Sequence, residues 1–192
     1  DRLVETPELF GWNWDVQVGG GFDAIPTEAA LEDLRAVPSV RGFSGGTTGE
    51  LTFTADSGRS QEVPTIGLDR VEGDVYPRLL KGRAAAGPDE VVMGSISMAD
   101  LGASVGDDVM VEQSDGETSE LEVVGRAVLP AIGAGNFATA GLGRGAVVTA
   151  EVLAPEAQPC VAWQHAGTVS EVGRIQRLSL VIGRVEDRAR KL

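Results

Sequence analysis

The strongest structural signal in the sequence is a β-hairpin near the middle of the chain. Two β-rich runs, at residues 109–112 and 121–124, are joined through Asp115 and Gly116. Both of these turn residues tolerate a positive φ, which tight hairpin turns require. The pattern therefore predicts an antiparallel pair of strands at the centre of a small β-rich lobe, which we expect to span residues 81–145.

The first half of the chain combines strand and helix patterns. Trp12, Trp14, Val16 and Val18 alternate with polar residues, which indicates a half-buried strand. Apolar residues at helical spacing predict a helix over residues 27–37, which Pro38 ends. Strands are predicted at 40–43, 50–55 and 62–68, with a glycine- and threonine-rich loop between the first two. A strand, a helix and further strands indicate an α+β fold.

The rest of the chain supplies shorter elements and one long helix. The sequence predicts strands at 91–94, 146–149 and 160–163, a helical turn at 98–101 and a loop at 130–145. From residue 170 to residue 192, apolar residues recur in steps of three and four, which indicates an amphipathic helix. We therefore expect a mixed α/β lobe that begins in 1–80, an inserted β-rich lobe in 81–145, and a return to the α/β lobe with a C-terminal helix in 146–192.

Composition and charge narrow the classes of partner. The chain is 42% hydrophobic and 23% charged, which is the balance of an ordinary folded domain. A formal net charge of −13 opposes binding to nucleic acid, because phosphate recognition needs clustered Lys and Arg. The single cysteine, Cys160, cannot form an internal disulfide or a cysteine-based metal site by itself.

Membrane signals are absent from the sequence itself. No run approaches the roughly 18 apolar residues of a transmembrane helix, and no signal-peptide pattern is present. We therefore expect the chain to be soluble. It begins at Asp1 without an initiator Met, which suggests a processed protein or a fragment cut from a longer one.

Two short motifs raise enzymatic alternatives. Residues 42–46 match the G-x-S-x-G nucleophile elbow, with Ser44 as nucleophile and His165 as a possible base, which would make the chain a small secreted serine hydrolase. However, a β-rich run follows Ser44 where the elbow needs a helix. Residues 133–138 resemble a dinucleotide-binding loop, but no helix pattern follows to face an anion, so we interpret them as a surface loop.

The acidic residues around the predicted hairpin do not form a convincing metal site. Asp107 and Asp108 are adjacent, and adjacent strand residues point to opposite faces, so neither they nor nearby Glu112 and Asp115 are expected to converge on one ion. We interpret the lone His165 as a surface or packing residue and Cys160 as a small buried apolar residue. The sequence predicts no catalytic residues, no cofactor and no metal.

A series of short motifs between residues 76 and 112 carries a family resemblance. They occur in the order Leu80, Gly82, Arg83, then Glu90, Val91, Val92, Gly94, then Leu101, Gly102, Val105, Gly106, Asp107, Val109, and residues 125–130 support them. This order resembles the extracytoplasmic core domain of FtsX-like permeases, also called the MacB-like periplasmic core domain. The resemblance covers most of residues 1–150 and ends near Cys160, after which residues 161–192 are basic and hard to align.

The resemblance implies a fold and a role. Domains of this family have a mixed α/β lobe joined to a small β-rich lobe, and they lie outside the cytoplasm between the first two transmembrane helices of an ABC transporter permease. They are not catalytic, because a separate cytoplasmic ATPase hydrolyses ATP. The expected task is to engage an extracytoplasmic lipid, lipoprotein, peptide or cell-wall protein and to couple it to the membrane helices of a permease that can work as a dimer.

The residues that would contact a partner are apolar. The candidates are Trp12, Trp14, Ile132, Phe137 and Leu142. The C-terminal helix either packs on the domain or forms a stalk towards the membrane or a neighbouring subunit. Besides the serine hydrolase, a free-standing extracellular binding module remains an alternative.

Overall fold

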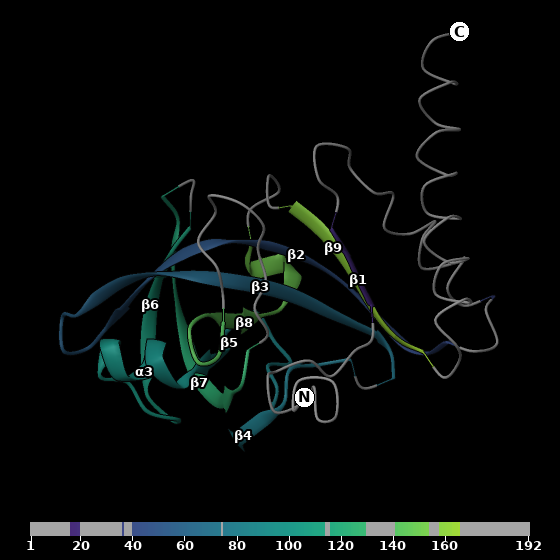
Figure 1. The fold of residues 1–192 in the computed structure, drawn as a ribbon. Helices are drawn as coiled ribbons and strands as arrows, with labels where there is room; N and C mark the ends of the chain where they lie inside the picture. Colours follow the sequence, from purple (N-terminus) through teal and green to yellow (C-terminus); the bar gives the residue numbers. More distant parts are fainter. Residues whose placement is uncertain are drawn as a thin grey trace, which may run out of the picture. The chain divides into compact units, whose positions relative to one another are not determined.

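A computed structural model of the chain describes residues 16–19, 36, 40–73, 75–113, 116–129, 141–153 and 158–165 (Figure 1). The predicted C-terminal helix lies outside these residues, and so does the predicted helix at 27–37 except for Ala36.

The chain groups into two compact units, each assembled from separate segments. The first contains Asp1–Asn13, Gly46–Asp69 and Tyr76–Ala157, and the second contains Trp14–Gly45, Arg70–Val75 and Gln158–Leu192. Strands β2 (Val40–Ala55) and β3 (Ser60–Glu72) each contribute residues to both units. The lobe boundaries near residues 80 and 145 stay a prediction.

In the second unit, the first and last described strands pair with each other. Strand β1 (Val16–Gly19) runs antiparallel to β9 (Gln158–His165), with Val16 opposite Trp163 and Gly19 opposite Cys160. The strands predicted around Val16 and at 160–163 are confirmed.

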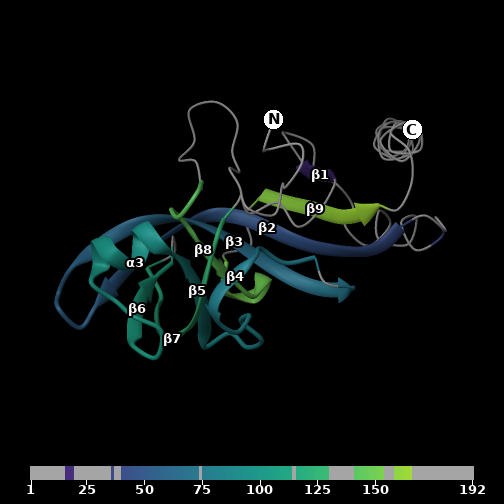
Figure 2. The same cartoon turned by 60° about the horizontal axis from the view of Figure 1, so that its bottom comes forward.

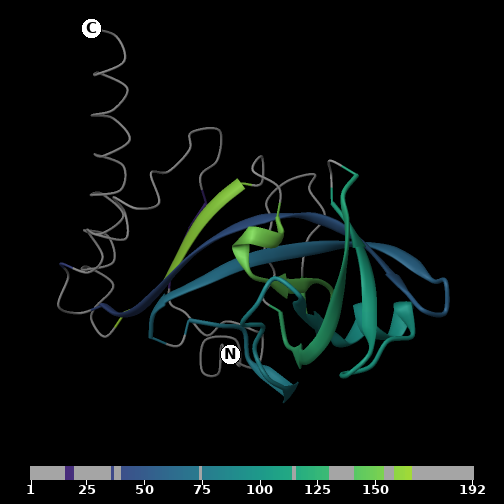
Figure 3. The ribbon, with the colours of Figure 1, turned by 180° about the vertical axis from the view of Figure 1, so that it is seen from behind.

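In the first unit, six strands close into a ring of hydrogen-bonded pairs (Figures 1 and 3). The further members are β5 (Glu90–Gly94), β6 (Asp108–Glu112), β7 (Thr118–Ala127) and β8 (Ala146–Val148). Strand β2 neighbours β3, β3 pairs with β8, β8 with β5, β5 with β7, β7 with β6, and β6 returns to β2. Each of the six strands has a neighbour on both sides, so the ring forms a small β-barrel.

Alternate residues of the barrel strands fill its interior. Because successive strand residues point to opposite faces, one set of apolar side chains from every strand faces inwards. The inward set includes Phe53, Val63, Val91, Met93, Val109, Val111, Leu121, Val123, Ala146 and Val148. Helix α3 (Ser95–Leu101) adds the side chains of Met98 and Leu101 to this core, and the short helix η2 (Ala150–Val152) adds Val152.

A second core lies against the outer face of the barrel strands. Strand β4 (Leu79–Gly82) pairs antiparallel with β7, and Figure 2 shows it beside the barrel strands. The preceding Tyr76 packs into a cluster that contains Ile66, Leu68, Val92, Val124, Ala127, Leu129 and Val147. The Tyr76 hydroxyl also accepts a hydrogen bond from the amide of Ala85 at 3.3 Å, which ties the segment after β4 to this cluster.

One sequence prediction about strand β2 is wrong. Residues 44–49 were expected to form a loop between two strands, but β2 continues without interruption from Val40 to Ala55. A Cβ atom on Gly46 would meet the backbone carbonyl oxygen of Gly67 in β3, so the glycine permits a close approach of two backbones. The glycines here therefore serve strand packing, not a turn.

The remaining predictions for the described residues agree with the structure. Strands β6 and β7 form the expected hairpin, and Gly116 in its turn has a φ of 85° and donates its amide to the carbonyl of Gln113 at 2.9 Å. The strands at 62–68, 91–94 and 146–149 are present, and α3 begins earlier than the predicted turn at 98–101. Strand β4 was not predicted. The α+β class is confirmed.

An ion pair closes the loop between β4 and β5. The guanidinium of Arg83 donates two hydrogen bonds to Glu90, one to each carboxylate oxygen, at 2.6 and 2.5 Å. The amide of Ala86 donates a third to Glu90 at 2.8 Å. The Arg83 hydrogen bond, followed by that of Ala86, lowers the pKa of Glu90 from 4.5 to about 2.

The barrel interior predicts a contrast between two methionines. Met93→Ala removes a fully buried side chain and should lower the free energy of unfolding by about 2–5 kcal/mol. Met110→Ala removes a side chain that is 43% exposed and should change it by no more than about 0.5 kcal/mol. Urea unfolding of both variants measures this difference, and equal losses would contradict the assigned interior.

The Arg83–Glu90 pair predicts a specific dependence of stability on pH. Because the folded-state pKa of Glu90 is depressed, its contribution is complete above pH 4.5 and is lost as the pH falls towards about 2. Glu90→Gln should therefore destabilise the protein most at neutral pH. The difference in free energy of unfolding between the wild type and this variant should shrink as the pH falls from 4.5 towards 2. Unfolding midpoints in urea at pH 7, 4 and 2.5 test this, and a constant gap would show that ionisation of Glu90 is not involved.

Candidate partner-contact surface

The turn before strand β8 has a tight and well-connected backbone. Residues Gly141 and Arg144 exchange backbone hydrogen bonds of 3.1 and 2.8 Å across the turn. Leu142 lies between them, and its amide donates to the carbonyl of Leu129 at 3.0 Å. The turn is thus anchored to the chain that follows β7.

The same turn caps the first turn of helix α3. The carbonyl oxygen of Gly143 accepts hydrogen bonds from the amides of Ile96 at 2.7 Å and Ser97 at 3.3 Å. These amides have no acceptor within their own helix, and the N-cap residue Gly94 has no side chain to supply one. A Cβ atom on Gly94 would meet the carbonyl of Gly143, so the glycine at this position allows the turn to approach.

Two side-chain contacts complete the attachment of the turn to α3. The buried hydroxyl of Ser97 accepts a hydrogen bond from the amide of Gly145 at 2.9 Å. On the exposed side, the guanidinium of Arg144 lies 3.3 Å from the carboxylate of Asp100. The exposed ion pair adds little stability, but it fixes the position of charge beside the turn.

This turn holds an apolar side chain in solvent. Leu142 has a φ of 30° and its side chain is 57% exposed. A positive φ costs a non-glycine residue roughly 1–2 kcal/mol. Because the Leu142 side chain is mostly exposed among the described residues, hydrophobic burial does little to offset this cost. The side chain of Ile96, which is 40% exposed, lies next to the turn, since a Cβ atom on Gly143 would be 3.2 Å from Ile96 Cγ1. We call these two residues the Leu142–Ile96 surface.

The Leu142–Ile96 surface contains one of the predicted contact residues. Leu142 is exposed as a contact residue must be, and its contact role stays a prediction. Trp12, Trp14, Ile132 and Phe137 lie outside the described residues. Ile96 was not predicted, because only the docking of the turn on α3 reveals that it lies against the turn that contains Leu142.

The geometry around Ser44 differs from that of a serine hydrolase. Ser44 is fully buried within strand β2, and its hydroxyl donates to the carbonyl of Gly45 at 3.2 Å. A nucleophile elbow instead places the serine on a sharp turn between a strand and a helix, where its hydroxyl is accessible. His165 ends strand β9, and the structure does not describe its side chain.

The acidic residues near the hairpin lie around a small hollow. A cavity of about 250 Å³ is lined by residues that include Asp56, Asp107 and Asp108. The carboxylate of Asp107 accepts a hydrogen bond from the amide of Ser104 at 2.9 Å, while Glu112 lies at the other end of strand β6. Asp115 and the loop at 133–138 lie outside the described residues. Within the described part of the chain, no three His, Cys, Asp or Glu side chains are grouped so that they could hold a metal ion.

No helix among the described residues combines the length and the apolar character needed to cross a membrane.

Comparison with known proteins shows the fold. No protein-family model matches the sequence, and no curated protein matches it significantly. Among solved structures, the periplasmic region of MacB from Actinobacillus actinomycetemcomitans is similar with a TM-score of 0.59 at 11% identity, over 95% of this chain and 90% of that one. A domain of a candidate permease from Porphyromonas gingivalis is similar with a TM-score of 0.52 at 14% identity, over 81% and 72%. The chain therefore has the fold of the MacB-like periplasmic domains that its sequence motifs resemble.

Proposed function

We propose that the chain is a non-catalytic extracytoplasmic domain of an ABC transporter permease. The observation that carries this proposal is the agreement of two features: the motif order between residues 76 and 112, and a fold shared with the periplasmic region of MacB over 95% of the chain. The buried position of Ser44 supports a non-catalytic role. The parent protein would lie in the cell membrane and work with a cytoplasmic ATPase.

The proposed task of the domain is to bind a partner outside the cytoplasm. The Leu142–Ile96 surface suits this task, because it is apolar, exposed and held by hydrogen bonds to α3. A preformed surface avoids the entropic cost of ordering a loop when the partner binds. Its apolar character favours a partner with apolar side chains, such as a peptide or lipoprotein.

The domain assignment is tested first on the complete coding sequence and its product. The proposal predicts apolar transmembrane segments on both sides of this chain and co-purification of the full-length protein with an ATPase subunit. A secretory signal peptide directly before the chain and a stop codon directly after it would contradict the permease assignment. That result would instead favour a free-standing extracellular module.

The contact role of Leu142 predicts a site-specific cross-link. A photo-reactive residue at position 142 in the full-length protein should cross-link to a partner in intact cells, because this position faces solvent on a rigid turn. The matched control is the same residue at position 110, which is 43% exposed on strand β6. Identical cross-linking patterns at the two positions would contradict a specific contact at Leu142.

A substitution at the same position separates contact from folding. Leu142→Gly removes the apolar side chain and relieves the positive φ, so the free energy of unfolding should stay equal or rise by about 1 kcal/mol. Transport or partner binding by the full-length protein should fall in the same variant. If the variant is destabilised by more than about 2 kcal/mol, Leu142 serves the fold and not a partner.

A further inference from the structure

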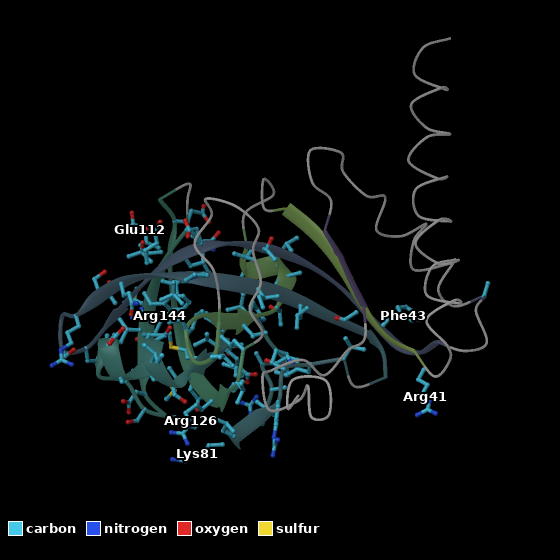
Figure 4. All side chains as sticks on the ribbon, viewed as in Figure 1. Arg41, Phe43, Lys81, Glu112, Arg126 and Arg144 are labelled. Atoms are coloured by element: carbon cyan, nitrogen blue, oxygen red, sulfur yellow. The ribbon has the colours of Figure 1, made fainter. Side chains whose placement is uncertain are left out.

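Two cations lie directly opposite each other where strand β4 pairs with strand β7. In the register of this antiparallel pair, Lys81 faces Arg126 (Figure 4). Side chains opposite each other in such a pair lie on one face of the sheet, with Cβ atoms about 5 Å apart. Like charges in this position repel, so the arrangement opposes folding unless an anion compensates it.

Neither cation has a counter-ion within the described residues. No hydrogen bond or ion pair of the Lys81 or Arg126 side chain occurs in this part of the chain. The carboxylates of Glu90, Glu122 and Asp89 instead lie close enough to Arg83 to raise the pKa of its guanidinium, chiefly through the hydrogen bonds with Glu90. The chain carries a net charge of −13, yet no carboxylate among the described residues forms an ion pair with Lys81 or Arg126.

The side chain of Arg126 is held in place by burial of its inner part. Its Nε atom is buried and has no hydrogen-bond partner among the described residues. On its other side Arg126 pairs with Met93 of β5, a fully buried member of the barrel interior. A buried donor without an acceptor costs stability, and the planar guanidinium of Arg is suited to hold a carboxylate or phosphate by two hydrogen bonds.

The form of strand β4 favours a compact anion over an added peptide strand. It has only four residues, its register shifts between Leu79 and Lys81, and Gly82 has a φ of 75°. Short, irregular and lysine-bearing edge strands are features that prevent pairing with another strand. The anion must therefore reach the two side chains without extending the sheet.

An exposed leucine beside the two cations indicates that the anion has an apolar part. Leu80 is the extra residue at the register shift between Leu79 and Lys81, where the alternation of side chains between the two faces is interrupted, and it is 48% exposed. A large apolar side chain next to unpaired cations matches an amphiphile whose phosphate meets the cations and whose acyl chain meets the leucine.

We propose that Lys81 and Arg126 form a binding site for the phosphate headgroup of an anionic lipid, with Leu80 in contact with its apolar part. The two cations would share one phosphate, which removes their mutual repulsion. The inference does not depend on the permease assignment, so its failure would leave that assignment untouched.

Sedimentation of the 192-residue chain with vesicles tests this site. Vesicles that contain phosphatidylglycerol should bind the chain, and pure phosphatidylcholine vesicles should not. Lys81→Thr should weaken binding to the anionic vesicles about fivefold, the typical contribution of one basic residue at a membrane surface. Arg126→Lys, which keeps the charge but loses the planar fork, should also weaken it.

A matched control distinguishes a site from general attraction of charge. Arg41→Thr removes an exposed cation from strand β2 and should leave vesicle binding unchanged. Equal losses for Arg41→Thr and Lys81→Thr would overturn the proposal. Thermal unfolding of Lys81→Thr should show equal or higher stability, because the substitution removes a repulsion, and a clear loss of stability would assign Lys81 to the fold instead.

Soluble glycerol phosphate separates a lipid from a free phosphate. Leu80→Thr should reduce vesicle binding but leave the weak NMR shifts caused by glycerol phosphate at residues 81 and 126 unchanged. Shifts with glycerol phosphate but no binding to anionic vesicles would overturn the lipid assignment. No response to either ligand would overturn the anion site itself.

Discussion

The closed ring of strand pairs in the first unit is the constraint on which the rest of the structure depends. Strand β6 completes it, since it pairs with β7 on one side and with β2 on the other. The six strands come from residues 40 to 148, so the ring brings distant parts of the chain into fixed register. The inward side chains of all six strands share one interior, so the strands bury their apolar surface jointly.

This rigid ring explains how two different surfaces are presented to solvent. The turn with Leu142 precedes β8 and is bonded to α3, which directly follows β5, so the ring fixes the apolar surface through the pairing of β8 with β5. Lys81 and Arg126 are opposed in the register of the β4–β7 pair, which shifts between Leu79 and Lys81. In both places the fold imposes an unfavourable local arrangement: the positive φ of Leu142 and the two opposed cations. Such unfavourable arrangements are concentrated at functional sites.

The sequence was informative where structure is local and uninformative where it is not. The β6–β7 hairpin follows from a turn that accepts positive φ, and the α+β class follows from the mixture of patterns. The continuous strand through residues 44–49 was missed because its glycines serve a close contact with Gly67, which only tertiary packing reveals. The parallel pairings of β3 with β8 and of β5 with β7 join distant segments and leave no local signal. The antiparallel pairing of β4 with β7, which opposes Lys81 and Arg126, is also long-range and was not predicted. Leu142 was named as a contact candidate from the sequence and is exposed, and its contact role stays a prediction, whereas the position of Ile96 beside the same turn required the structure.

The most direct test of the account asks on which side of the membrane the barrel lies. Asp56 is exposed in the turn between β2 and β3, so a cysteine at this position, in a full-length protein with Cys160→Ser, would be accessible to reagents. The account predicts that a membrane-impermeant thiol reagent labels Asp56→Cys in intact cells, or in cells with only the outer membrane permeabilised, as completely as after lysis. Labelling only after the cytoplasmic membrane is broken would contradict it.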